Sequence, residues 1–148
     1  MGKAGVKAAT NSAYTDAARE FNLAIATSPE LARALGEWPE SPTDATAVDQ
    51  VQVLGLMRAL LHMWSNGYRQ YRAGTLDPTL MDALKQEVST FAIGASDNPA
   101  IIQRAKMLNY AWSLERFLFP PSFQHFVDDL LTSGGTANAG DPTRPLDS

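Results

Sequence analysis

The longest amphipathic pattern in the chain extends from Thr46 to Ala73 and contains no proline. Its apolar residues recur at about 100° per residue and cover roughly half of the helix circumference. A surface helix usually has a narrower apolar arc, of about 100°. The pattern therefore predicts a long central helix that two or more neighbouring helices contact, with Trp64 in the core and Arg69 at the surface.

Residues that start and end helices divide the rest of the chain. Ser28-Pro29, Asp77-Pro78 and Asn98-Pro99 each join a capping side chain to a proline, which suits the first helical turn. Gly74 and the pair Gly134-Gly135 are expected to end helices. Besides the central helix, the pattern predicts helices at about residues 12–27, 29–36, 78–93, 98–119 and 122–133, and it predicts no β-strand.

These elements predict an all-α fold, a single bundle-like domain of five to six helices around the central helix at about residues 46–73. We expect a flexible N-terminus at residues 1–11, the helical domain at residues 12–132, and a disordered tail at residues 133–148. From Thr136 onward, Leu146 is the one apolar side chain larger than alanine, so the tail has little surface to bury.

Composition narrows the classes of function. The chain has no cysteine, which excludes disulfides, thiolate metal sites and cysteine nucleophiles. A net charge of −4 gives no reason to expect a nucleic-acid partner. No apolar run approaches the 18 or so residues of a membrane helix, and Val6 stands where an N-myristoylation motif requires Ser or Thr. We therefore expect a cytoplasmic protein without a transmembrane segment.

A basic stripe on the central helix is the first candidate site. Arg58, His62, Arg69 and Arg72 fall on one side of the helix, opposite its apolar half. The stripe could bind an anion such as a phosphate or a lipid headgroup. It could equally form salt bridges with acidic side chains of neighbouring helices, or face water. The sequence leaves these alternatives open.

Metal binding and catalysis have weaker support. His125, Asp128 and Asp129 have a spacing at which an imidazole and carboxylates can converge on a metal. A closed site needs further ligands, and His62 is the only other histidine, so we predict no metal site and no cofactor. No phosphate loop, metalloprotease motif or nucleophile elbow is present, and Arg116 is expected to neutralise Glu115. The sequence gives no residues on which to base an enzymatic activity.

The segment at about residues 98–119 has two apolar faces, which need cover on both sides. We assign Ile101, Ala105, Leu108 and Trp112 to the core-facing side, and Met107, Tyr110, Leu114, Phe117 and Leu118 to the other side. Either the helix is enclosed within the domain, or the second face meets a partner. If it meets a partner, Tyr110, Leu114 and Phe117 are the interface candidates, because tyrosine and phenylalanine are common at interfaces.

Two segments, QYRAGTLDPTLMDAL at residues 70–84 and FPPSFQHFVDDLL at residues 119–131, resemble an uncharacterised bacterial family. Its members usually have one N-terminal membrane helix followed by a small all-helical cytosolic domain; this chain lacks such a helix. The residues that fit are Tyr71, Gly74, Leu76, Asp77, Phe123, Phe126, Val127 and Asp128, with a weaker match from Phe21 to Leu31. The resemblance implies a helical fold and carries no activity with it.

The sequence thus favours a non-enzymatic interaction or scaffolding module. The expected partner is another protein or a second copy of the chain, and peripheral membrane association stays open. The alternative is a binding domain for a small anionic or apolar ligand.

Overall fold

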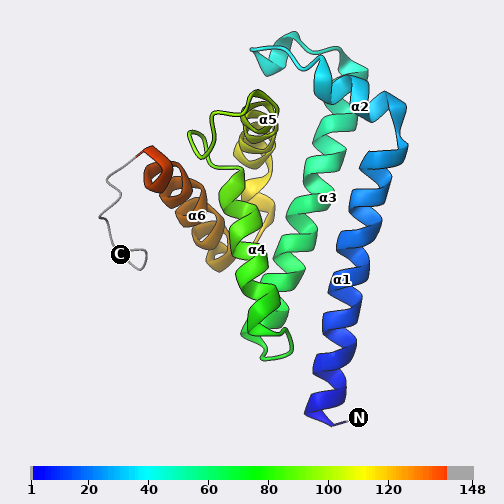
Figure 1. The fold of residues 1–148 in the computed structure, drawn as a ribbon, viewed down its shortest axis with the longest axis vertical. Coiled ribbons are helices and arrows are strands. Elements are labelled where there is room, and N and C mark those ends of the chain that lie inside the picture. Colours follow the sequence, from blue (N-terminus) through cyan, green and yellow to red (C-terminus); the bar gives the residue numbers. More distant parts are fainter. Residues whose placement is uncertain (1, 140–148) are drawn as a thin grey trace. The chain divides into compact units, whose positions relative to one another are not determined.

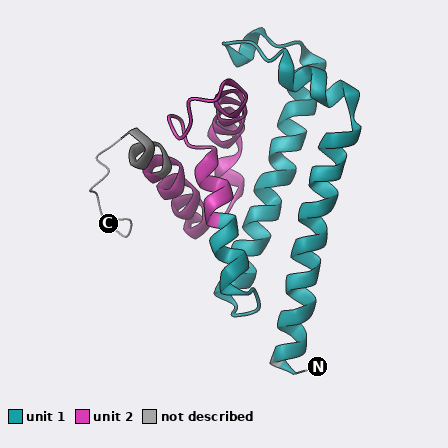
Figure 2. Cartoon of the chain, in the orientation of Figure 1, with its two compact units in different colours: residues 1–84 teal, residues 85–148 magenta. Residues whose placement is uncertain are grey.

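The computed structural model describes residues 2–139, which form α-helices and short 3₁₀ helices and contain no strand (Figure 1). In chain order the elements are α1 (Lys3–Thr27), α2 (Pro29–Gly36), η1 (Pro42–Asp44), α3 (Ala47–Arg72), α4 (Pro78–Thr90), α5 (Pro99–Glu115), η2 (Arg116–Leu118) and α6 (Pro121–Ala139). The predicted all-α fold with a long central helix is confirmed. Within this fold the chain forms two compact units, Met1–Leu84 and Lys85–Ser148 (Figure 2).

Both ends of the helical region extend further than the sequence pattern predicted. α1 begins at Lys3, so the expected flexible N-terminus at residues 1–11 is helical from that point. Alanine and lysine are good helix formers, which favours this extension. α6 continues to Ala139, past the pair Gly134-Gly135 where we expected it to end. Glycine costs about 1 kcal/mol in a helix but does not stop it as proline does. Residues 140–148 of the predicted tail lie outside the described residues.

The first unit is organised around α3. Trp64 and Leu61 on this helix are fully buried, while Arg69 on its opposite side is exposed, and both sequence predictions are confirmed. α1 and α2 pack on α3, and α1 runs alongside it for most of its length (Figure 1). The Asn11 Oδ1 atom of α1 accepts a hydrogen bond of 2.8 Å from the backbone N–H of Asp77. α1 therefore also binds the chain at the start of α4.

Gly67 allows neighbouring side chains to approach α3 closely. A Cβ atom at this position would lie 2.8 Å from both Leu84 Cδ1 and Tyr14 Cε2. At Gly55, on the exposed side of the same helix, a Cβ atom would have nothing within 4 Å. The absence of a side chain is thus needed for packing at Gly67 and not at Gly55.

The two glycines predict opposite effects of the same substitution. Gly55→Ala should raise the free energy of unfolding by roughly 0.5–1 kcal/mol, because alanine loses less backbone entropy in a helix. Gly67→Ala should lower it by about 1–3 kcal/mol, because the methyl group overpacks the contact with Tyr14 and Leu84. Urea unfolding followed by circular dichroism measures both. Equal effects of the two substitutions would contradict the orientation of α3.

The second unit is built on an aromatic cluster between α5 and α6. The ring centroids of Phe119 and Phe123 lie 5.3 Å apart, and those of Trp112 and Phe123 lie 5.9 Å apart in a T-shaped arrangement. Offset and edge-to-face aromatic pairs of this kind contribute about 0.5–1.5 kcal/mol beyond area burial. Pro120 lies between η2 and α6, and Pro121 is the first residue of α6. The two prolines end the preceding helix, so the chain turns here and brings these rings together.

Candidate functional site

The structure separates the buried and exposed apolar residues of α5. Leu108 and Trp112 are buried, as predicted for the core-facing side. Met107, which we assigned to the second apolar face, is fully buried as well, so the chain itself covers part of that face. The buried arc is wider than expected because it also includes Ala111, which lies one turn further along from Met107.

The remaining residues of the second face form a compact apolar patch. Leu114, Phe117 and Leu118 are 54%, 74% and 69% exposed, and we call these three residues the η2 patch. Tyr110, the third interface candidate, is only half-buried. A 3₁₀ turn replaces the last α-helical turn here and carries Phe117 and Leu118. Leu114 and Phe117 are thus exposed in the described chain, and their contact with a partner stays a prediction.

Asp128 of α6 holds the end of α5 in place below the η2 patch. Its Oδ1 atom accepts a hydrogen bond of 2.7 Å from Trp112 Nε1, and its Oδ2 atom accepts one from Arg116 Nη2. The Arg116 guanidinium also lies 5.1 Å from the centroid of the Phe117 ring. An ion pair and a charge-assisted hydrogen bond on one carboxylate fix the geometry of this turn. The η2 patch is therefore presented by an ordered backbone.

These contacts bear on two expectations about chemistry. Arg116 forms an ion pair with Asp128, whereas the sequence suggested Glu115 as its partner. Asp128 is committed to Trp112 and Arg116, and His125 is exposed. In the range 2–139 no three His, Cys, Asp or Glu side chains are grouped so that they could hold a metal ion.

The basic stripe lies on the exposed side of α3. Arg58, His62, Arg69 and Arg72 are all exposed. Arg69 Nη2 donates a hydrogen bond of 2.9 Å to Asn66 Oδ1, and the Arg72 guanidinium lies 5.9 Å from the centroid of the Tyr68 ring. These are contacts along the surface of one helix. Anion binding by this stripe stays a prediction.

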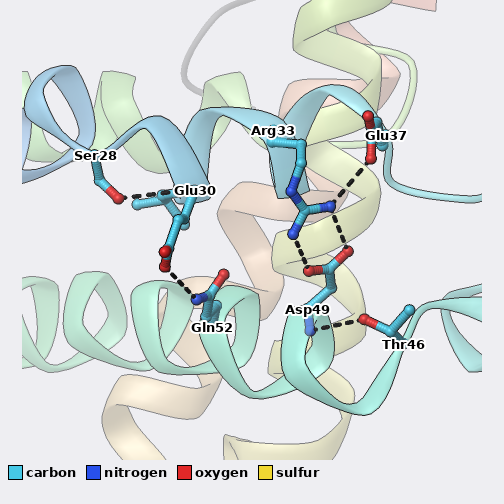
Figure 3. A network of polar contacts seen from close by, with 8 residues as sticks. Ser28, Glu30, Arg33, Glu37, Thr46, Asp49 and Gln52 are labelled. Atoms are coloured by element: carbon cyan, nitrogen blue, oxygen red, sulfur yellow. Dashed lines mark hydrogen bonds and ion pairs between the residues drawn. The ribbon is translucent and has the colours of Figure 1, made fainter.

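One two-point ion pair in the first unit was not predicted. Arg33 of α2 makes two hydrogen bonds to the buried Asp49 carboxylate, of 2.7 Å from Nη2 and 3.2 Å from Nη1, and also bonds to Glu37 at 3.0 Å (Figure 3). The hydroxyl of Thr46 caps α3 by accepting a hydrogen bond from the backbone N–H of Asp49. The two-point contact joins α2 to the first turn of α3.

Beside this contact, Gln52 of α3 donates a hydrogen bond to Glu30 of α2 (Figure 3). The sequence pattern does not reveal the Arg33–Asp49 pair, because its partners lie on different helices. The sequence does contain a signal for the start of α3. Thr46-x-x-Asp49 places an acid in the first helical turn, three residues after the capping threonine.

The Arg33 guanidinium holds the pKa of the Asp49 carboxyl below its ordinary value of 3.8, mainly through their hydrogen bonds, and burial opposes this shift. The same contact raises the pKa of Arg33 above its ordinary value. A carboxyl whose pKa is lower in the folded state adds stability above its unfolded pKa. That stability is lost as the pH falls through the folded pKa, so the pair weakens only in acid.

Asp49→Asn should lower the urea midpoint at pH 7, because it removes the charge that pairs with Arg33. It should also flatten the decline in stability as the pH falls below 3.8, the ordinary pKa of this carboxyl, because the wild-type carboxylate takes up a proton in that acid range. Arg19→Gln is the matched control, since Arg19 pairs with Asp16 on an exposed surface and should contribute about 0.5 kcal/mol or less. Identical acid limbs for wild type and Asp49→Asn would contradict the assignment.

A shallow hollow lies in the second unit between the loop after α4 and the start of α5. Ile93, Ile101 and Ile102 line it together with backbone and small side chains, and Lys106 stands at its edge. It encloses about 250 Å³, a figure that includes the open space at its mouth. Small-molecule sites are usually larger, at about 300–1,000 Å³, and contain several convergent polar groups.

The chain matches no known family model, and no curated protein or solved structure is significantly similar to it. The resemblance to a bacterial membrane-anchored family therefore stays a prediction from the motifs alone. Among the described helices, none combines the length and the apolar character needed to cross a bilayer.

Proposed function

We propose that this chain is a non-enzymatic interaction module and that the η2 patch is a docking surface. The observation that carries the proposal is the exposure of Leu114, Phe117 and Leu118 within two turns of chain. Large apolar side chains gathered at one exposed place typically mark an interaction site. The Asp128 contacts support this role because they order the turn before any partner binds.

A second copy of the chain is the partner that this patch fits most simply. The three side chains are uncharged, and the Arg116 guanidinium beside Phe117 is neutralised by its ion pair with Asp128, so two patches meet with little charge repulsion. Two-fold pairing buries the same residues on both sides. Fully burying one leucine or phenylalanine contributes about 1.5–3 kcal/mol, and association costs several kcal/mol in lost freedom. A patch of three residues therefore supports a weak dimer that forms at high protein concentration.

Binding of a small ligand has less support. The hollow beside Ile101 is smaller than a typical ligand pocket, and its edge carries one charged group, Lys106. The basic stripe of α3 is spread along one exposed helix side. Neither feature brings several polar groups together around a cavity, so the interaction proposal is preferred.

The test is the oligomeric state of a Leu114→Glu, Phe117→Glu double variant. Light scattering coupled to size exclusion should show a wild-type mass that rises with concentration up to several hundred micromolar. The double variant should remain a folded monomer, because charge on the patch prevents docking without opening a cavity.

Leu23→Glu is the matched control, since Leu23 is 60% exposed but belongs to α1. It should dimerise as the wild type does. A wild type that stays monomeric at every concentration, or a double variant that unfolds, would contradict the proposal.

A further inference from the structure

α1 and α2 are held to α3 in different ways, although a single residue separates them. Arg33 of α2 makes two hydrogen bonds to the buried Asp49 of α3, and a further hydrogen bond joins the same two helices. α1 has 25 residues against eight in α2, yet Tyr14 is the one buried residue among its described side chains. Elements with few buried contacts are the first to open locally. The chain therefore changes from loosely held to firmly held at Ser28.

α1 is attached to the first unit near the middle of the helix. The Tyr14 ring lies against Gly67 of α3, and Leu84 of α4 approaches the same point. Asn11 Oδ1 accepts a hydrogen bond of 2.8 Å from the backbone N–H of Asp77. Asn11 and Tyr14 are three residues apart, so they lie on the same side of the helix. We call Gly67, Leu84 and the backbone N–H of Asp77 the α1 seat.

Both ends of α1 lack the groups that usually stabilise helix ends. The N-cap residue, Gly2, makes no side-chain hydrogen bond, the first turn contains no acid, and the last turn contains no basic residue. Towards the C-terminal end, Leu23 is 60% exposed, and Phe21 and Ile25 are only half-buried. The helix is nevertheless rich in alanine and longer than the roughly 15 residues at which isolated helices become marginal. α1 can therefore leave the α1 seat and keep part of its helical structure.

Ser28 provides a hinge between the two helices. Its backbone is extended, with φ −103° and ψ 104°, and Pro29 disfavours helical geometry at the residue before it. The Ser28 hydroxyl accepts a hydrogen bond from the backbone N–H of Leu31, so it caps α2. A change in the backbone dihedral angles of this one residue moves α1 and leaves α2 in place on α3.

We propose that α1 is a displaceable strap and that the α1 seat, once vacated, binds α1 of a second copy of the chain. The structure shows which helix fits the seat, since α1 covers it in the described chain. A second copy presents Asn11 and Tyr14 at the same spacing. Exchange of α1 between two copies therefore restores the contacts that its release breaks, which is why identical elements can swap between protomers.

The strap stays closed on its own chain most of the time. α1 is tethered through Ser28, so it competes at a high effective concentration with any α1 that arrives from solution. Exchange becomes prominent when the contacts of the tethered α1 are weakened. Binding at the α1 seat is also independent of the η2 patch, which belongs to the other unit.

Hydrogen exchange of the wild-type chain tests whether α1 is displaceable. We expect the backbone amides around Tyr14 of α1 to exchange at least about tenfold faster than those around Trp64 of α3, because α1 opens without the rest of the unit. Equal protection of the two segments would mean that α1 opens only when the whole unit unfolds, and would overturn the proposal.

The probe for binding by a second copy is a fluorescent peptide of residues 2–28. The receptor is the full chain with Asn11→Ala, Tyr14→Ala, in which the tethered α1 is weakened. Fluorescence anisotropy should show that the peptide binds this receptor at least about tenfold more tightly than it binds the wild type, where the tethered α1 occupies the seat. A peptide that carries Asn11→Ala, Tyr14→Ala is the matched control and should bind at least about tenfold more weakly.

Further variants of this receptor locate the site. Gly67→Ala should weaken peptide binding about fivefold or more, because a Cβ atom there would lie 2.8 Å from Tyr14 Cε2 of the seated helix. Gly55→Ala is the matched control and should leave binding unchanged, since a Cβ atom at that position meets nothing within 4 Å. Leu114→Glu, Phe117→Glu should also leave binding unchanged, which separates the α1 seat from the η2 patch.

Four results of the binding experiment would overturn the proposal. Equal binding of the peptide and its control would mean that Asn11 and Tyr14 do not select the site. Equal binding to the wild type and the weakened receptor, or insensitivity to Gly67→Ala, would mean that the peptide binds elsewhere. Loss of the cooperative urea transition in the Asn11→Ala, Tyr14→Ala chain would show that α1 is part of the core and not a strap.

Discussion

The architecture of the first unit depends on the burial of one face of α3. Trp64 and Leu61 are fully removed from solvent on that face, and α1 and α2 are placed by packing against it. Burying a large apolar side chain contributes about 1.5–3 kcal/mol, so this face carries much of the unit's stability. A helix with one buried side has one exposed side by geometry, and the basic stripe of α3 lies on that exposed side.

Polar contacts fix the ends of the helices relative to one another within each unit. The Arg33–Asp49 pair joins α2 to the first turn of α3, and the Asn11 side chain binds the chain at the start of α4. In the second unit, Asp128 has the corresponding role for Trp112 and Arg116. In both units, folding is achieved by buried apolar faces and a few charge-assisted hydrogen bonds. The exposed apolar residues take no part in these buried faces, and we assign binding to those of the η2 patch.

Much of this could be predicted from periodicity. The spacing of apolar residues identified α3, the burial of Trp64 and the exposure of Arg69. Periodicity could not decide whether Met107 is buried or exposed, because the width of a buried arc depends on the neighbours that pack there. It could not reveal the Arg33–Asp49 pair, since a contact between two helices depends on how the chain brings them together. The sequence also could not show what the basic stripe does, because the positions of basic residues along a helix do not identify a ligand.

The central claim is that the exposed apolar residues serve binding and contribute nothing to folding. The most direct measurement is the urea-unfolding free energy of the triple variant Leu114→Gln, Phe117→Gln, Leu118→Gln at low protein concentration. Glutamine is a good helix former, so backbone propensity should not mask the result. We expect a free energy of unfolding within about 1 kcal/mol of the wild type, since surface changes usually have effects within about 0.5 kcal/mol each. A loss of several kcal/mol would show that the folded chain itself covers these side chains and would contradict the claim.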